Sequence, residues 1–364
     1  MPSWFAVIPP GLESALSAEL REQGVGSAQV QPGGARFQAS LEAGARLSSS
    51  LRTPSRLLVE LGEGRVLTLE QLGSLARSLD WRPYLEPGIP VQIECSIKES
   101  RIRFSDAASS KVEHAIADAL RGPRLPGFRS GRPPDPQRIT VRIQEDVARL
   151  SVDAGGDLLH TRGWRQQAGK APIRENLASA LLYVAGWRPG EPLLDPFCGA
   201  GTIPVEAALR ALGRPPAPGR RYAWHAWPAL RAKAGPSARP RGSVEVQGIF
   251  SSDKDSRAVA DARDNALRAG VSLPWSVLDV GEITPPCVEP GFIVTNPPYG
   301  ERLGQSVEGV YTTFGRALRE RFAGWRVLFL APHAGLAQRV HRDARRLTTF
   351  SNGGIRVGAW AVEL

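Results

Sequence analysis

The spacing of apolar residues predicts mixed helices and strands over the first 156 residues. Apolar positions recur at helical intervals in three segments and follow strand-like patterns in others. The predicted helices are Gly11–Gln23, 68–79 and Ser105–Leu120. The strand-like runs are Trp4–Ile8, Val91–Cys95, Ile139–Ile143 and Ala148–Val152. Residues 121–138 are rich in Pro, Gly and Arg and are predicted to form a loop.

From about residue 172 the pattern becomes a regular alternation of strand and helix. The predicted strands are Pro192–Asp195, Val244–Phe250, Trp275–Leu278, Phe292–Thr295 and Val327–Leu330. The predicted helices are Glu175–Ala185, Ile203–Leu212, Asp255–Arg268 and Val310–Phe322. This alternation predicts an α/β fold with a doubly wound parallel sheet. Such sheets bind ligands beyond the carboxyl ends of their strands.

A glycine-rich turn follows the first of these strands. It reads Asp195-Pro-Phe-Cys-Gly-Ala-Gly-Thr202 and leads into a helix. Gly199 and Gly201 allow a sharp turn and a close approach of backbone to ligand, and the helix N-terminus suits a carboxylate. Taken alone, Asp195 could equally well cap that helix. Cys198 is predicted to be a small loop residue rather than a nucleophile, because no histidine lies near it in the sequence.

Acidic residues follow the second and third strands. Asp253 and Lys254 come after the second strand, where a carboxylate can accept both ribose hydroxyls. Asp279 and Val280 come after the third, where a carboxylate can accept the amino group of adenine. Together with the glycine-rich turn, these two acidic segments place signals at three successive strand ends. This constellation predicts a site for a nucleoside-containing cofactor.

The fourth strand ends in Asn296-Pro297-Pro298-Tyr299-Gly300. The Asn296 side-chain oxygen and the Pro297 carbonyl can accept the two N–H groups of an exocyclic amine, and so aim its lone pair. Two prolines stiffen the turn and remove competing N–H donors. Tyr299 offers a flat face on which a base can stack. The alternative is a simple Pro-Pro turn with Asn as a turn former.

Charge and cysteine content narrow the function further. The 364 residues carry a formal net charge of +10, supplied mostly by arginine, which favours a polyanionic partner. High genomic GC content also replaces Lys with Arg, but it explains the net excess less well. The three scattered cysteines indicate neither a metal site nor disulfides. We therefore expect a cytoplasmic protein with no metal. No stretch of about 18 apolar residues occurs in the sequence, so we also expect no membrane span.

At this point the sequence resembles a known family. Residues 172–364 resemble the class I methyltransferases that carry an (N/D)PP(Y/F) motif, and more narrowly the RlmL-type enzymes that methylate guanine N2 in 23S rRNA and the related tRNA enzymes. The matching segments are LHTRGWRQQAGKAPIRENLASALL (159–182), DPFCGAGTIPVEAAL (195–209), SSDKDSRAVADARDNALRAG (251–270), NPPYGERLG (296–304) and SNGGI (351–355). The N-terminal half more loosely resembles a ferredoxin-like and THUMP pair.

The resemblance implies a domain order and a cofactor. The expected domains are ferredoxin-like (1–60), RNA-binding THUMP (61–156), linker (157–171) and Rossmann-like methyltransferase (172–364). The implied cofactor is S-adenosylmethionine, and Arg174 and Glu175 match a segment that lines its site in the family. The cofactor-binding candidates are Arg174, Glu175, Asp195, Phe197, Cys198, Gly199, Ala200, Gly201, Thr202, Asp253, Lys254, Asp279, Val280 and Asn296. The catalytic candidates are Asn296, Pro297, Pro298 and Tyr299.

Several alternatives remain open on the sequence. The substrate is expected to be structured RNA, with 23S rRNA ahead of tRNA, and the protein is expected to be a monomer. Adenine N6 is the alternative target, because the same motif serves there. The third hypothesis is that the protein is a non-enzymatic RNA-binding assembly factor. The insert at 213–242 carries Tyr222, Trp224 and Trp227 among arginines, and these aromatic residues either stack on RNA or pack the insert against the protein.

Overall fold

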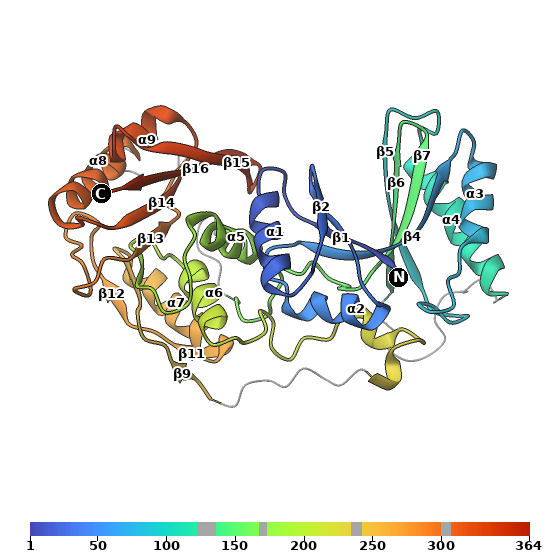
Figure 1. The fold of residues 1–364 in the computed structure, drawn as a ribbon, viewed down its shortest axis with the longest axis horizontal. Coiled ribbons are helices and arrows are strands. Elements are labelled where there is room, and N and C mark those ends of the chain that lie inside the picture. The colour runs from blue at the N-terminus through green and yellow to red at the C-terminus, as the bar shows by residue number, and fades with distance from the viewer. Residues whose placement is uncertain (122–135, 167–172, 234–241, 300–306) are drawn as a thin grey trace.

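The computed structural model describes residues 1–121, 136–166, 173–233, 242–299 and 307–364. Within these residues the chain forms two halves, each built on a seven-stranded sheet (Figure 1). Most of the predicted loop at 121–138, part of the 213–242 insert, and Gly300 after the Pro-Pro motif lie outside the described residues.

The N-terminal half has strand order β2-β3-β1-β4-β7-β6-β5. Of the described pairs in this sheet, β5 and β6 are parallel and the others antiparallel. The elements are β1 (Ser3–Val7), α1 (Glu13–Glu22), β2 (Ala28–Gln31), β3 (Gly34–Gln38), α2 (Leu41–Ser50), β4 (Arg56–Arg65), α3 (Leu69–Ser78), β5 (Val91–Lys98), α4 (Ser105–Leu120), β6 (Gln137–Gln144) and β7 (Val147–Asp153). Helix α2 was not expected from the sequence.

Strand β4 joins the two parts of this sheet. Its first residues pair with β1, and from Leu58 onward it also pairs with β7. The register with β7 shifts between Glu60 and Gly62, beside the domain boundary expected at residue 60. A bulge adds twist to a strand, so the sheet is continuous but changes direction there. The division into domains at residue 60 remains a prediction.

The C-terminal half is doubly wound, as expected. Its strand order is β12-β10-β8-β13-β14-β16-β15, with β12 to β14 parallel and β16 antiparallel to both neighbours. The elements are α5 (Glu175–Ala185), β8 (Leu193–Asp195), α6 (Thr202–Ala211), β10 (Ile249–Asp253), α7 (Ser256–Ala269), β12 (Trp275–Val277), β13 (Phe292–Thr295), α8 (Val307–Arg321), β14 (Arg326–Ala331), α9 (Ala334–Val340), β15 (Arg345–Asn352) and β16 (Ile355–Glu363).

One strand prediction was wrong. The run Val244–Phe250 does not form a single strand, because it contributes β9 (Val244–Glu245) to a small separate sheet and the first residues of β10 to the main sheet. Strand β9 pairs in parallel with β11 (Val271–Ser272). Between β9 and β10 lies Gly248 at φ +77°, a left-handed conformation that ends an extended run.

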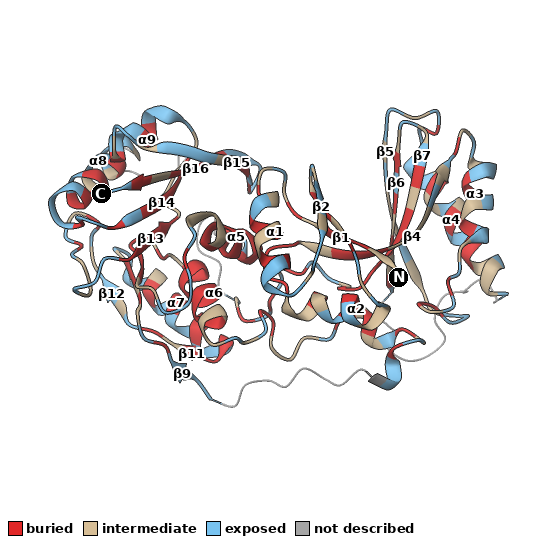
Figure 2. Ribbon diagram, viewed as in Figure 1, coloured by how far each residue is buried: buried red, intermediate tan, exposed pale blue. Residues whose placement is uncertain are grey.

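Helix α5 lies between the sheet of the C-terminal half and the N-terminal half. Its residues from Glu175 to Leu182 are all buried, and Figure 2 shows the helix as largely red. It contacts β13, β14 and α6 of its own half and α1 of the other. A helix that is covered on all sides needs no polar stripe, which explains why its apolar pattern is almost unbroken.

A buried charge network spans the contact between the halves. Glu206 on α6 lies 3.1 Å from Arg162 and 3.8 Å from Arg52, and it accepts a hydrogen bond from Ser179 at 2.5 Å. Arg162 also donates to the carbonyl of Arg52, and the Arg52 and Thr53 amides donate to Glu19 on α1. Within the expected linker, Leu159, Arg162 and Trp164 are buried, so the described part of that segment belongs to the interface.

Candidate active site

The predicted site residues come from the carboxyl ends of neighbouring parallel strands. Strand β8 lies between β10 and β13, and β12 flanks β10. The loops that follow these four strands therefore leave the sheet at the same edge. The fold thus brings together the segments that begin at Asp195, Asp253, Asp279 and Asn296.

The loop after β8 turns sharply at its two glycines. Gly199 has φ +50° and Gly201, at the N-terminus of α6, has φ +79°. A Cβ at Gly201 would lie 2.9 Å from the Trp275 ring and 3.0 Å from the Ala262 Cβ, whereas a Cβ at Gly199 would meet nothing within 4 Å. The second glycine therefore packs the helix onto its neighbours, and the first faces open space where a ligand can approach.

Asp195 does not cap helix α6. Its Oδ1 accepts hydrogen bonds from the Thr295 hydroxyl at 2.6 Å and from the Phe197 amide at 3.2 Å. Desolvation by complete burial raises the pKa of Asp195 from 3.8 to about 7, against the lowering effect of these two donors. Because Thr295 directly precedes Asn296, this contact connects the glycine-rich loop to the Pro-Pro motif.

Asp253, at the end of β10, is also tied to the glycine-rich loop. Its Oδ2 accepts from the Gly199 amide at 2.9 Å, and its Oδ1 accepts from the Asp255 amide at 3.0 Å. The amide of Cys198 donates to the Ser252 carbonyl at 3.0 Å. Burial raises the pKa of the Cys198 thiol well above its usual range, which makes it a poor nucleophile.

Asp279 and Lys254 occupy the exposed rim of the site. The Asp279 side chain is exposed and accepts from the Gly281 amide at 2.9 Å, while Val280 is buried. The Leu278 amide donates to the Asp253 carbonyl at 3.0 Å, which aligns the second and third predicted segments. Lys254 is exposed.

Arg174 and Glu175 lie at the start of α5 and differ in burial. Arg174 is exposed, while Glu175 is buried and pairs with Arg165 at 3.0 Å. Desolvation raises the pKa of Glu175, and Arg165 opposes that rise. Arg165 also donates to the Ile173 carbonyl at 2.8 Å and reaches the Thr202 hydroxyl at 3.5 Å. Arg165 was not predicted as a site residue, although it lies in a matching segment.

The Pro-Pro motif presents one buried acceptor without a donor. The Oδ1 atom of Asn296 is buried and has no hydrogen-bond partner among the described residues. Pro297 is buried, and Pro298 and Tyr299 are half-buried. An unsatisfied buried acceptor costs about 1–3 kcal/mol. Within the described residues, the Asn296 oxygen is therefore an acceptor that remains open to a donor at the carboxyl end of β13.

Two further residues that contact this region were not predicted as site residues. Thr295 was predicted only as a strand residue, although its hydroxyl is bonded to Asp195. Asn352, at the end of β15, donates from Nδ2 to the Tyr299 hydroxyl at 2.6 Å. The position of Thr295 directly before the motif could have drawn attention to it. Asn352 lies in the matching segment SNGGI (351–355), but its contact with Tyr299 spans 53 residues and was not predicted.

The aromatic residues of the insert pack against the protein. Tyr222, Trp224 and Trp227 are all buried. Trp227 stacks on Trp4 with ring centroids 6.4 Å apart, meets Tyr84 edge-on, and donates from Nε1 to Gln137 at 2.8 Å. In the described part of the insert, Trp227 packs against the N-terminal half, and none of the three rings is exposed for stacking on RNA.

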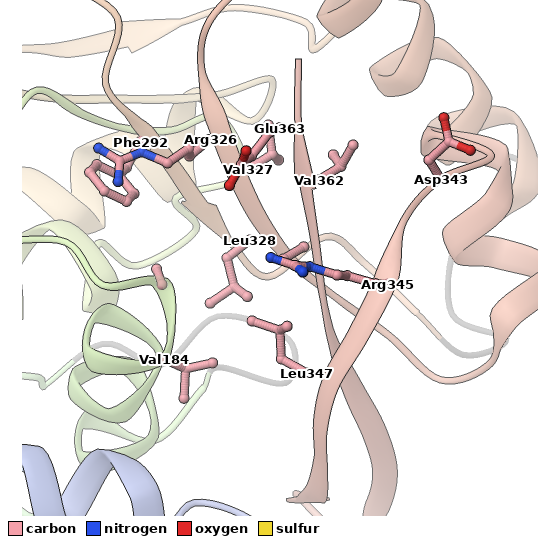
Figure 3. A pocket seen from close by; sticks show the side chains of 12 residues that line it. Val184, Phe292, Arg326, Val327, Leu328, Asp343, Arg345, Leu347, Val362 and Glu363 are labelled. Carbon is pink, nitrogen blue, oxygen red and sulfur yellow. The ribbon is translucent and has the colours of Figure 1, made fainter.

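A cavity of about 340 Å³ lies at the opposite edge of the same sheet (Figure 3). It adjoins Phe292 and Arg326, the first residues of β13 and β14. The Arg326 guanidinium lies 3.9 Å from the centre of the Phe292 ring. Because parallel strands place their carboxyl ends at the other edge, this cavity is separate from the candidate site.

No group of three or more His, Cys, Asp or Glu residues that could hold a metal occurs among the residues that the structure describes. Over the same described ranges, no helix is long and apolar enough to cross a membrane.

The sheet order and the glycine-rich loop define a class I methyltransferase. The model of the RMKL-like methyltransferase domain matches residues 162–358, more than half of the chain, and the chain belongs to this family. The RlmL ferredoxin-like domain matches residues 3–58. Both the family and the fold class expected from the sequence are confirmed. The methyl donor of this family, S-adenosylmethionine, is the cofactor.

Solved structures resemble the chain over its whole length. SMU.472, a candidate methyltransferase solved in complex with SAH, is 27% identical with a TM-score of 0.83, covering 100% of this chain and 98% of the other. A predicted N6-adenine-specific DNA methylase from Listeria monocytogenes is 26% identical, with a TM-score of 0.82 and coverage of 99% and 96%. TrmN from Thermus thermophilus shares the fold at 23% identity and a TM-score of 0.73, covering 100% and 99%.

Proposed function

We propose that this methyltransferase modifies the exocyclic N2 of a guanosine in structured RNA, with 23S rRNA as the first candidate and tRNA as the second. The observation that carries this proposal is the buried Oδ1 of Asn296 at the carboxyl edge of β13, which has no hydrogen-bond partner among the described residues. The net charge of +10 and the RlmL ferredoxin-like match support an RNA substrate. We expect residues 61–156 to capture RNA as a THUMP domain and 172–364 to act on it, as a monomer in the cytoplasm.

In this mechanism the protein places an amine and provides no strong base. When bound, S-adenosylmethionine supplies an electrophilic methyl group on its sulfonium sulfur. Asn296 Oδ1 and the Pro297 carbonyl accept the two N–H groups and turn the nitrogen lone pair toward that carbon. As the new N–C bond forms and the S–C bond breaks, the nitrogen becomes acidic and releases a proton to water. Well-oriented reactants can gain roughly 7–11 kcal/mol from placement.

The cofactor site in this proposal uses the residues that the four strand ends bring together. The open side of Gly199 and the N-terminus of α6 receive the amino-acid end of the cofactor. Asp253 would accept hydrogen bonds from the ribose hydroxyls. These bonds would replace or join the one that it accepts from the Gly199 amide. Asp279 would accept the adenine amino group from the rim of the site.

Adenine N6 is the second candidate target. The Asn296–Tyr299 segment suits any exocyclic amine, and the Listeria structure is described as a predicted N6-adenine-specific DNA methylase. The two functions separate in one experiment, in which the protein transfers a labelled methyl group to unmodified 23S rRNA, tRNA or duplex DNA. We expect N2-methylguanosine from RNA after nucleoside analysis. N6-methyladenosine as the sole product, or a preference for duplex DNA, would reverse the assignment.

A further inference from the structure

The hairpin formed by β15 and β16 reaches the Pro-Pro motif with a single side chain. Asn352 is the last residue of β15, is 6% exposed, and donates from Nδ2 to the Tyr299 hydroxyl at 2.6 Å. Burial raises the pKa of Tyr299, and the Asn352 amide opposes that rise. The hydroxyl is thus held in a desolvated position by a donor from another part of the sheet.

The turn of this hairpin does not itself require asparagine at residue 352. Asn352 pairs with Ile355 across the two strands, and the left-handed positions between them are Gly353 at φ +59° and Gly354 at φ +86°. Two consecutive residues with positive φ form the tight turn that suits a hairpin. The Asn352 side chain therefore makes its contact with Tyr299 independently of the turn geometry.

The same strand is in contact with the N-terminal half four residues earlier. The Thr348 hydroxyl donates to the Gly11 carbonyl, and a Cβ at Gly11 would lie 2.1 Å from the Thr349 carbonyl oxygen. Only glycine fits this approach, and Gly11 directly precedes the turn into α1. Strand β15 is thus fixed by the N-terminal half near its middle, and Figure 1 shows it beside the part of that half that carries α1. At its end the strand contacts Tyr299.

We propose that Asn352 is a positioning residue that holds the Tyr299 ring as one wall of the base pocket, on a strand that the N-terminal half keeps in place. This inference rests on the proposed function, because it takes Asn296–Tyr299 as the base site. Its physical basis is that a catalytic geometry tolerates little misplacement. A ring that is free to turn would leave the base, and hence its amino group, less well aligned with Asn296.

The test is a double-mutant cycle between Asn352→Ala and Tyr299→Phe, measured as the rate of methyl transfer to 23S rRNA at saturating cofactor. We expect each single variant to lower this rate by about 3- to 10-fold, the effect of one hydrogen bond. The double variant should be no slower than the slower single variant, because both remove the same contact. The Kd for S-adenosylmethionine should stay unchanged.

The control is Ser351→Ala, which changes the exposed neighbour of Asn352 on the same strand and should keep the wild-type rate. Effects that multiply in the double variant, or a wild-type rate for Asn352→Ala, would overturn the inference while the proposed function stands. A wild-type protein that transfers methyl groups to DNA but to no RNA would contradict the proposed function first. Equal melting temperatures of the variants exclude loss of folding as the cause.

Discussion

At the residue scale, the candidate site combines side chains whose polar atoms have hydrogen-bond donors with a buried acceptor, Asn296 Oδ1, that has none among the described residues. Asp195 has two donors, Asp253 has two donors, and the Tyr299 hydroxyl has one. In the proposed function, Asn296 Oδ1 accepts a substrate N–H group, while the contacts of Asp195 and Tyr299 hold the segments around it in place.

The buried carboxyl of Asp195 predicts an unusual dependence of stability on pH. Because its pKa is raised to about 7, the folded protein keeps the proton between the ordinary value of 3.8 and 7, while the unfolded chain loses it. The free energy of unfolding should then fall as pH rises through this window, by an amount on the order of a few kcal/mol. Asp195→Asn should lack this loss, because its amide does not ionise.

The measurement is denaturant unfolding of the wild type and of Asp195→Asn from pH 4 to 8. The difference between the two proteins isolates the one group, because all other titrating residues are shared. We expect the variant to gain stability relative to the wild type as pH rises from 4 to 7. A difference that stays constant over this range would show that Asp195 is already ionised at low pH.

At the scale of elements, the periodic segments were predicted well and the irregular ones were not. Helices α4 and α5 and strand β13 have the predicted bounds, because each has a clear apolar pattern and a definite end. Helix α2, with the sequence LEAGARLSSS, combines glycine and serines, which are weak helix formers. It is stabilised instead by the Ser40 cap and by packing on β4.

The site was predictable to the extent that it follows strand ends. The sequence predicts that the segments beginning at Asp195, Asp253, Asp279 and Asn296 lie together, and the fold places them at one edge of the sheet, because a doubly wound sheet brings successive strand ends together. Arg165, Thr295 and Asn352 were not found, because their contacts depend on side-chain direction and on pairing between distant segments. The β15–β16 hairpin that carries Asn352 was itself not predicted as a pair of strands.

The insert provides a prediction at this scale. Trp227→Ala removes a fully buried ring that stacks on Trp4 and bonds to Gln137, and it should cost about 3–5 kcal/mol of stability. Arg231→Ala removes only an exposed ion pair with Glu86 and should cost less than about 1 kcal/mol. Urea unfolding measures both. A Trp227→Ala protein with normal stability and weakened RNA binding would contradict the packing role.

At the scale of the whole molecule, the N-terminal half is fixed to the catalytic half by buried charges and by packing. Glu206 is fully buried and forms ion pairs with two arginines of the interface, Arg162 and Arg52. In the proposed function, the N-terminal half captures RNA, and it must then lie at a constant distance from the candidate site if the same nucleotide is to be presented each time. The buried network supports such a constant arrangement.

Removing the shared carboxylate tests this interface. Glu206→Ala leaves two buried guanidinium groups without the carboxylate that balances their charge, and this change should cost about 3–5 kcal/mol. The matched control is Glu22→Ala. Glu22 also crosses between the halves, but its side chain is 44% exposed where it accepts from Arg210 and Tyr183, so its loss should cost less than that of Glu206. Thermal or denaturant unfolding gives both values. Equal, small effects would show that the network does not hold the halves together.

The central claim is that the Asn296 oxygen holds the amino group that receives the methyl group. The most direct test measures labelled methyl transfer to RNA by Asn296→Ala, together with its Kd for S-adenosylmethionine by calorimetry. Our account predicts that turnover is abolished while the Kd stays nearly unchanged, because the residue acts on the substrate amine. Methyl transfer at the wild-type rate by this variant would contradict the account.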